Sequence, residues 1–316
     1  MSQVFVITEH INGQFEDITF EMLGKGKEVA SSTGGELVAV LMGSGQKDLA
    51  SQLGVADKVI YADHAELANF NPEAHSKTAA AIVAANSPKL VIAASSSMGM
   101  EIAPAISVDC NMSMIAYVSN ISADGQTLVS QLYGGKMNVE SAVEGNGCVA
   151  CVLPGAFSGD AGQGGGSPAV EDFTAPDLSG LKIKFKQLIA PDSSGVDITQ
   201  QGILVSVGRG IQNADNLPMV EELAAKIGGA ISCSRPIVDN KWLPKSRQVG
   251  KSGLKVKPKF YLALGISGAP EHIEGMKDAE LIIAVNSDPN APIFDYAHYG
   301  VVGDLFDIIP ELTGKL

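Results

Sequence analysis

The sequence lacks the long apolar runs and the basic leader that would mark a membrane-inserted or exported protein. No hydrophobic stretch approaches the roughly 18 residues that are needed to cross a bilayer. The chain starts with MSQVFVITEH, which leads into a strand-like run without a basic segment, so no signal peptide is expected. These absences predict a cytoplasmic protein without membrane insertion.

Cysteine is also scarce, and its placement argues against disulfides, metal sites and iron–sulfur clusters. Four cysteines in 316 residues are too few for a disulfide framework. Cys148 and Cys151 have the spacing of a redox or zinc pair, but they lie in the apolar, strand-like run 147–153, where residues three apart point to opposite faces. Cys110 and Cys233 stand alone and fit small buried hydrophobic positions. No metal site is therefore expected.

Arginine is the scarcest charged residue, and its distribution is uneven. The formal net charge of −13 argues against nucleic acid as a partner. Residues 1–190 contain 10 Lys and no Arg against 20 Asp and Glu, a net charge of −10, whereas residues 191–316 contain 9 Lys and 3 Arg against 15, a net charge of −3. A general preference for lysine explains the scarcity of arginine but not its clustering in the second part, at Arg209, Arg235 and Arg247.

A basic segment runs from Asp239 to Glu271 with no acidic residue between them. It holds two glycine turns, GKSG at 250–253 and GISG at 265–268, and the second turn follows the apolar run 260–264. A strand, a glycine turn with a hydroxyl and a helix form an anion site, because free N–H groups and the helix dipole converge on the ligand. The segment therefore predicts a site for a phosphate-bearing cofactor. Its basic residues are Lys241, Lys245, Arg247, Lys251, Lys255, Lys257 and Lys259.

Strand-like apolar runs alternate with helical patterns in both parts, which is typical of a mostly parallel sheet covered by helices on both faces. Strands joined by turns between residues 116 and 153 predict an antiparallel addition. The polar segment 191–201 predicts a linker between domains 1–190 and 191–316. Strands are expected at residues 4–8, 37–42, 58–61, 90–94, 203–207, 230–233, 260–264, 281–285 and 299–302, and helices at 17–32, 47–53, 72–86, 99–108, 217–227 and 304–312.

Two segments of the first part have features of a phosphate site. The glycine-rich tract 158–167 precedes no helical pattern and is expected to be a flexible surface loop. The serines Ser95, Ser96 and Ser97 follow a strand, and both an anion site and a turn cap explain them.

Six motifs of the second part together resemble the alpha subunit of electron-transfer flavoproteins. The first part resembles this family more loosely, through VFVITEH at 4–10 and QLYGGKM at 131–137, so the resemblance covers the whole chain. The six motifs are LVSVGRG (204–210), SRPIVD (234–239), RQVGKSG (247–253), LALGISGAPEH (262–272), AVNSDPNAPIF (284–294) and DYAHYGVVGDLFDIIPEL (295–312).

The resemblance implies two α/β domains. The first would be a nucleotide-hydrolase-like α/β assembly domain with the antiparallel addition, and the second a doubly wound parallel sheet that binds FAD. It further implies a bacterial cytoplasmic heterodimer with a beta subunit, which itself carries AMP or a second FAD. Electrons would come from flavin dehydrogenases, such as acyl-CoA dehydrogenases, and pass to a quinone reductase or a ferredoxin-type acceptor.

Two alternatives to this carrier function stay open. The chain could be an oxidoreductase subunit in a flavin-based electron-bifurcating complex that oxidises NADH, or a nucleotide-binding module without redox function. As a carrier, the protein would have no substrate of its own.

The family's cofactor contacts transfer to seventeen positions of this sequence. The diphosphate end of FAD is expected at Arg209, Gly265, Ile266, Ser267, Gly268 and Ala269, and the adenosine end at Asn286, Asp304 and Leu305. The flavin ring is expected at Ser234, Arg235, Gln248, Val249, Gly250, Lys251, Ser252 and His272.

Three of the ring contacts are expected to tune the flavin. Positive charge at Arg235 and His272 would raise the reduction potential, and the Ser252 hydroxyl would bond N5. Structural alternatives stay open: an ion pair with Asp239 for Arg235, a capping or surface position for His272, and a helix N-cap for Asp304. The chain departs from the family where Lys251 replaces the usual Gln, and an ammonium there would favour anionic flavin if it points inward.

Overall fold

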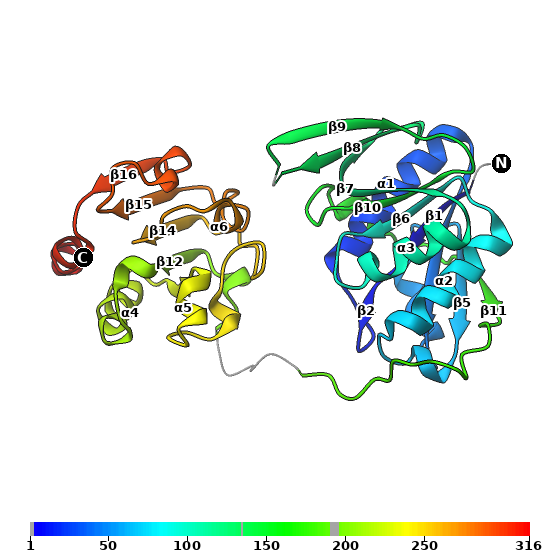
Figure 1. The fold of residues 1–316 in the computed structure, drawn as a ribbon, viewed down its shortest axis with the longest axis horizontal. Helices are drawn as coiled ribbons and strands as arrows, with labels where there is room; N and C mark the ends of the chain where they lie inside the picture. The colour runs from blue at the N-terminus through cyan, green and yellow to red at the C-terminus, as the bar shows by residue number, and fades with distance from the viewer. Residues whose placement is uncertain (1–2, 134, 190–195) are drawn as a thin grey trace. The chain divides into compact units, whose positions relative to one another are not determined.

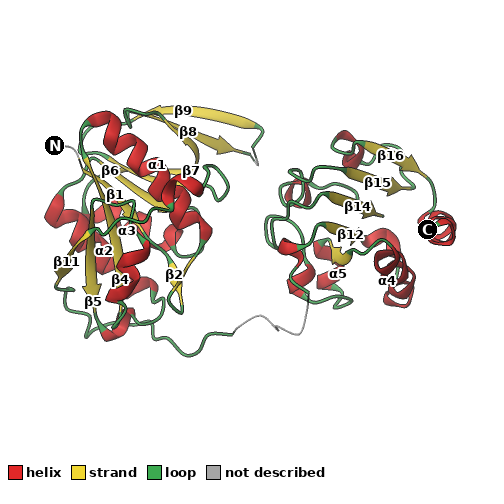
Figure 2. Ribbon diagram, turned by 180° about the vertical axis from the view of Figure 1, so that it is seen from behind, coloured by secondary structure: helices red, strands yellow, loops and turns green. Residues whose placement is uncertain are grey.

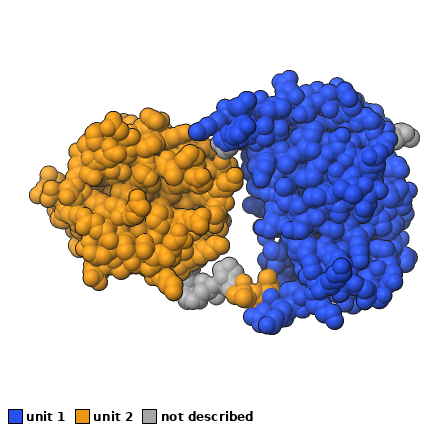
Figure 3. All heavy atoms as spheres, viewed as in Figure 1, with its two compact units in different colours: residues 1–187 blue, residues 188–316 orange. Residues whose placement is uncertain are grey.

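The computed structural model describes residues 3–133, 135–189 and 196–316. The chain forms two compact units, residues 1–187 and residues 188–316 (Figure 3). Part of the expected linker, residues 191–195, lies outside the described residues, and the domain boundary after residue 190 stays a prediction. In the described part of the chain, no helix has the length and apolar character needed to cross a membrane.

Unit 1 is built on a nine-stranded sheet in the order β11-β5-β4-β1-β6-β10-β7-β8-β9 (Figure 1). The strands are β1 (Gln3–Ile7), β4 (Glu36–Gly43), β5 (Lys58–Asp63), β6 (Leu90–Ala94), β7 (Ser113–Ile121), β8 (Thr127–Leu132), β9 (Met137–Ala142), β10 (Cys148–Val152) and β11 (Ala169–Phe173). A small antiparallel pair, β2 (His10–Ile11) and β3 (Gln14–Phe15), lies apart from it. The helices are α1 (Asp17–Thr33), α2 (Pro72–Asn86) and α3 (Gly99–Asp109), and the 3-10 helices are η1 (Lys47–Gln52), η2 (Ala65–Leu67) and η3 (Asp160–Gly162).

Helices cover both faces of the parallel part of this sheet, which explains its nearly continuous hydrophobic strands. Alternate residues of β1 enter different cores: Val4 packs in the core that contains α1, and Phe5 packs in the core that contains α2 and α3. The same alternation places Cys148 in the first core and Cys151 in the second, as the strand pattern predicts. The two thiols therefore cannot act as a pair.

The antiparallel addition consists of β7, β8 and β9, whose last two strands form the hairpin seen in Figures 1 and 2. The expectation that this addition extends to residue 153 is wrong, because β10 pairs in parallel with both β6 and β7. The edge strand β11 is an addition that the sequence pattern did not predict; it pairs in parallel with β5. Residues 47–53, expected as a helix, form the 3-10 helix η1 instead.

Most residues of the glycine-rich tract 158–167 are exposed, as expected of a surface loop, but some of its glycines pack tightly against other backbone. Gly162 is buried against α1, and a Cβ atom on it would collide with the carbonyl oxygen of Phe20. A Cβ atom on Gly166 would likewise collide with the carbonyl oxygen of Gly54. Backbone packing thus requires glycine at these two positions, which composition alone cannot reveal.

Unit 2 is a parallel five-stranded sheet in the order β13-β12-β14-β15-β16. The second strand of the unit, β13, lies at one edge beside β12, and the later strands follow on the other side of β12. This is a doubly wound arrangement in which the strand order reverses between β12 and β14. The strands are β12 (Ile203–Val207), β13 (Ala230–Cys233), β14 (Phe260–Leu264), β15 (Ile282–Asn286) and β16 (Tyr299–Val302), and the helices are α4 (Leu217–Lys226), α5 (Arg235–Asp239), α6 (Pro270–Ile273) and α7 (Leu305–Lys315). The 3-10 helices are η4 (Ile198–Gln200), η5 (Arg209–Ile211), η6 (Ala214–Asn216), η7 (Lys245–Arg247) and η8 (Pro292–Asp295).

The two faces of this sheet are covered differently. Helices α4 and α7 pack on one face, with Val220 and Ile309 fully buried there. The other face is covered mainly by irregular chain, including Val249, Val256 and the short helix α6 with Ile273. Loops therefore surround the carboxyl ends of the strands on this side and can shape a binding site.

Candidate cofactor-binding site

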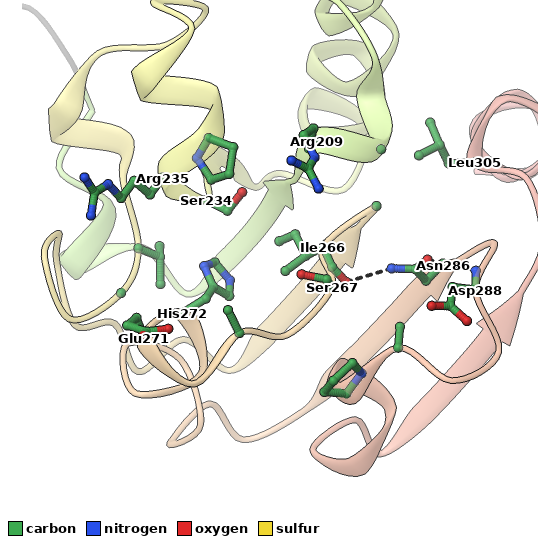
Figure 4. A pocket seen from close by; sticks show the side chains of 18 of the residues that line it. Arg209, Ser234, Arg235, Ile266, Ser267, Glu271, His272, Asn286, Asp288 and Leu305 are labelled. Carbon is green, nitrogen blue, oxygen red and sulfur yellow. Dashed lines mark hydrogen bonds between the residues drawn. The ribbon is translucent and has the colours of Figure 1, made fainter. Parts of the chain in front are cut away.

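A cavity of ≈ 890 Å³ opens at the carboxyl ends of the strands of unit 2 (Figure 4). Parallel sheets bind ligands at this edge, next to the point where the strand order reverses. Every site residue expected from the sequence lines the cavity except Gly268, whose backbone packs against Ile293 instead. The sequence did not single out nine further lining residues: Gly210, Gln212, Pro236, Glu271, Ser287, Asp288, Ala291, Pro292 and Gly303. Most of them lie beside or inside the six motifs. Their position in the loops that follow the strands could therefore have identified them as lining residues.

The loop after β14 lines part of the cavity with Ile266, Ser267 and Ala269. Among the described residues, the backbone N–H groups of Ile266, Ser267, Gly268 and Ala269 donate no hydrogen bond within the protein. The Asn286 side chain holds the loop in place by donating from Nδ2 to the Ile266 carbonyl at 2.9 Å. Consecutive unpaired N–H groups are the usual backbone site for an anion. The donor set therefore fits a diphosphate.

Gly265 is required where this loop starts. Its φ of +63° is strained for other residues, and a Cβ atom would lie 2.7 Å from Cα of Gly210 and 2.9 Å from Cδ2 of Leu305. The turns after β12 and β14 can approach each other only because both positions are glycine. This close approach brings the Arg209 turn beside the free N–H groups.

The helix after the GISG turn is shorter than the sequence suggests. Helix α6 has only four residues, so the expectation of a helix dipole aimed at the ligand is wrong. A macrodipole needs several aligned turns, and α6 has about one. The loop amides and side chains must provide the positive potential at this point.

Arg209 and Arg235 line the cavity, whereas Arg247 does not. The Arg247 guanidinium donates from one terminal nitrogen to the Ile231 carbonyl at 2.9 Å, which is a structural contact. Arg235 forms the alternative ion pair, with Nε 3.4 Å from Oδ2 of Asp239. Both side chains are more than half exposed, so this pair stabilises the fold little. In Figure 4 the Arg235 guanidinium points away from Arg209 and Ser267.

The segment from Gln248 to Ser252 forms a tight loop at the cavity wall. Gln248 Nε2 donates to Oγ of Ser252 at 3.0 Å, and the Lys251 N–H donates to the Glu271 carbonyl at 2.6 Å. The loop is thus held to α6 by its backbone. The Ser252 hydroxyl keeps its own proton available for a ligand.

Asp304 and Asn286 also line the cavity. Oδ1 of Asp304 accepts a hydrogen bond from the Phe306 N–H at 2.9 Å, so the N-cap alternative is correct for α7. The same residue also lines the cavity, and a carboxylate has a second oxygen for a ligand hydroxyl or amino group. The cap and a ligand contact are therefore compatible.

His272 is neither a surface histidine nor a positive charge. It is 6% exposed, and its Nε2 lies 2.9 Å from the hydroxyl oxygen of Tyr261. Burial lowers the pKa of the imidazole to about 4, although the nearby Val249 carbonyl raises it in part. The ring is therefore neutral near pH 7. This does not fit the expectation of a cation at His272, but a neutral imidazole can still donate a hydrogen bond to a ligand.

Comparisons with known proteins agree with this geometry. Residues 4–178 match the family model described as the electron transfer flavoprotein domain, and residues 197–277 match the electron transfer flavoprotein FAD-binding domain. The electron transfer flavoprotein subunit alpha of Methylophilus methylotrophus is 33% identical over 322 residues, covering 100% of this chain and 99% of the relative. Protein FixB of Clostridium saccharobutylicum is 32% identical over 320 residues, covering 99% of this chain and 95% of the relative.

A third relative has a more specific name. The lactate dehydrogenase (NAD(+),ferredoxin) subunit LctC of Acetobacterium woodii is 32% identical over 331 residues, covering 98% of this chain and 75% of the relative. The family models and these relatives cover both units. Membership of this family implies a flavin as cofactor and a beta subunit as partner. The chain belongs to the electron transfer flavoproteins and is an alpha subunit of this family.

Proposed function

We propose that unit 2 holds one non-covalent FAD in its cavity, and that the protein carries electrons from flavin dehydrogenases to a quinone reductase or another acceptor. The observation that carries this proposal is the row of four backbone N–H groups at residues 266–269 without partners in the described structure. They lie in a unit that matches a FAD-binding family model, and three of these residues, Ile266, Ser267 and Ala269, line a cavity of ≈ 890 Å³. A dinucleotide needs both a diphosphate site and an extended pocket.

The lining residues divide into three groups along the cavity. Arg209 and residues 265–269 would hold the diphosphate, and Asn286, Asp304 and Leu305 the adenosine end. Ser234, Arg235, residues 248–252 and His272 would surround the flavin ring, with Arg235, Ser252 and His272 tuning it. Bound FAD would supply the redox chemistry, and these side chains would orient it and set the potential around it.

The partners follow from the family. The beta subunit would complete the heterodimer and carry AMP or a second FAD, and the complex would work in the bacterial cytoplasm. Acyl-CoA dehydrogenases are the donors that we expect. The protein would act as a carrier without a substrate of its own, because FAD would occupy the cavity.

Similarity to LctC favours a second candidate, a subunit of an electron-bifurcating complex that oxidises NADH and reduces a ferredoxin-type acceptor. Co-expression with the beta subunit separates the two. A carrier is expected to yield a yellow heterodimer whose FAD is reduced by an acyl-CoA dehydrogenase with its substrate, but not by NADH. Reduction by NADH alone would favour the second candidate, and a colourless heterodimer would contradict both.

A further inference from the structure

The turn after β12 contains a strained backbone position at the wall of the cavity. Gln212, which lines the cavity, has a φ of +70° and a ψ of −48°. The Asn213 N–H donates to the Ile211 carbonyl at 2.9 Å across this residue, so the three residues form a γ-turn with positive φ. This form of γ-turn is rare and strained, above all for a residue that carries a side chain.

The surroundings of the turn hold it in this conformation from both sides. Ile211 is 0% exposed and packs in the core that contains α4. Its carbonyl oxygen accepts a second hydrogen bond, from Nδ2 of Asn216 at 2.9 Å. On the other side, Oδ1 of Asn213 accepts the N–H of Asp215 at 2.9 Å, at the start of η6. Backbone strain persists only where the surrounding structure fixes it, and it is concentrated at functional sites.

The glutamine at this position has no structural explanation within the chain. Glycine adopts a positive φ without strain, and Gly265 in the same site has a φ of +63°. Position 212 has a glutamine instead, although its side chain is exposed. Among the described residues, the Gln212 amide forms no hydrogen bond that would offset the strain. A ligand in the cavity would explain both the amide and the strained turn that presents it.

We propose that Gln212 is a further cofactor-binding residue, whose side-chain amide donates a hydrogen bond to the diphosphate of FAD. The proposal rests on the proposed function, which assigns the diphosphate to Arg209 and the loop after β14. The Gln212 N–H donates to the Arg209 carbonyl at 3.1 Å, so the two residues belong to one turn. Gly210 in this turn lies against Gly265, directly before residues 266–269. The amide thus adds a donor to a site for negatively charged phosphates, where hydrogen bonds are strong.

Two substitutions separate the amide from the backbone strain. FAD affinity is measured by titration of the flavin-free heterodimer, and stability by urea unfolding of the full-length chain, followed through Trp242 in unit 2. Gln212→Glu keeps the turn and the side-chain length but replaces the donor with a carboxylate. We expect an unchanged urea midpoint and a dissociation constant of FAD raised by ~100-fold, because the carboxylate repels the diphosphate.

Gln212→Gly removes the amide and the strain together. The urea midpoint should therefore rise, whereas the dissociation constant of FAD should increase by ~10-fold, the equivalent of one hydrogen bond to a charged group. A stability gain and an affinity loss in the same variant are not expected of a turn with a structural role alone.

Lys241→Gly is the matched control in unit 2. Lys241 also has a positive φ, +61°, and it is exposed and lies outside the cavity lining. The control should raise the urea midpoint and leave FAD affinity unchanged. Normal FAD affinity in Gln212→Glu would overturn the proposal, whatever Gln212→Gly does, and would leave FAD binding itself in place. A heterodimer that binds no FAD before any substitution would overturn this proposal together with the proposed function.

Discussion

The two units contain parallel sheets of similar construction, but their strand ends differ in what occupies them. In unit 1 the Glu9 carboxylate follows β1 and accepts a hydrogen bond from Oγ of Ser96 at 2.7 Å. Ser96 in turn accepts the N–H of Gly99 at 2.9 Å, at the start of α3. In unit 2 the loop after β14 lines a cavity with Ile266, Ser267 and Ala269, whose N–H groups donate no hydrogen bond among the described residues. The protein's own side chains thus fill the carboxyl ends of the strands in unit 1, whereas a cavity lies at the carboxyl ends of the strands in unit 2.

This difference shows that the topology of a parallel sheet provides a position where a ligand can bind, but does not by itself form a binding site. Glu9 is 3% exposed, and burial raises its pKa. A carboxyl group at this edge disfavours a phosphate, both by filling the space and, when ionised, by its charge. Among the serines after β6, Ser96 accepts the N–H groups of Met98 and Gly99 and so caps the turn, which favours the cap over an anion site. A nucleotide module based on unit 1 alone is correspondingly disfavoured.

The largest effect on FAD binding should come from a substitution that separates the turns at the strand ends of unit 2. In Gly265→Ala the new methyl group would meet Gly210 and Leu305 at 2.7 and 2.9 Å and force the turns after β12 and β14 apart. We expect FAD binding by the heterodimer to weaken by ~100-fold or more, measured by titration of the flavin-free protein with FAD.

Gly34→Ala is the matched control in unit 1. Gly34 has a nearly identical φ of +62° but nothing within 4 Å of an added Cβ. The substitution should cost about 1 kcal/mol of stability from backbone strain and leave FAD binding unchanged. Normal FAD affinity in Gly265→Ala would show that the close approach of the turns is not needed for the site.

Acid should destabilise both units through one buried histidine in each. Burial lowers the pKa of His75 in unit 1 and of His272 in unit 2 from 6.5 to about 4. The unfolded chain binds these protons first, so the free energy of unfolding falls as the pH drops from about 6.5 to about 4, by on the order of 3 kcal/mol for each histidine.

The single tryptophan, Trp242, lies in unit 2, so its fluorescence reports the unfolding of that unit. His272→Gln should remove most of the pH dependence seen by Trp242 during urea unfolding of the full-length chain. His75→Gln should leave it in place. Equal pH dependence in the unchanged chain and in His272→Gln would show that His272 is not held neutral by the fold.

A smaller effect is expected where one residue caps a helix and borders the cavity. Asp304→Ala should lose the N-cap of α7, which costs about 1 kcal/mol of unit 2 stability, and should also weaken FAD binding. Asp304→Asn keeps a capping oxygen and should weaken FAD binding alone. Chemical unfolding and FAD titration of both variants check this. Equal FAD affinity in all three proteins would assign Asp304 to the cap only.

The smallest effect is expected at the exposed ion pair of Arg235 and Asp239. Asp239→Asn should change the free energy of unfolding by no more than about 0.5 kcal/mol, because both side chains are largely solvated. If Arg235 serves the flavin, Arg235→Ala should lower the flavin reduction potential while Asp239→Asn does not. A large loss of stability in Asp239→Asn would instead make the pair a structural element.

The fold was largely predictable, because strands buried on both faces appear as short apolar runs. Runs such as residues 203–207 and 260–264 coincide with β12 and β14. The pairing of β10 was not predictable, since an apolar strand carries no mark of its neighbours' direction. The packing of Gly162 on α1 was equally hidden, because glycine is common in both flexible and tightly packed segments.

The site was predictable as a set of positions but not in its electrostatics. The motifs bring together all the expected lining residues except Gly268. The charge of His272 depends mainly on its burial by the surrounding chain and in part on the backbone carbonyl of Val249, and neither can be read from a motif. The motifs indicate which residues come together at the site. The protonation of a side chain depends instead on its burial, and the dipole of a helix on the length of that helix.

The central claim is that FAD occupies the open sheet edge of unit 2. An experimental structure of the heterodimer, purified with its natural flavin, tests it most directly. We expect FAD in the cavity with its diphosphate against the N–H groups of Ile266 and Ser267. A flavin found only on the beta subunit, or a FAD whose diphosphate lies away from this loop, would contradict it.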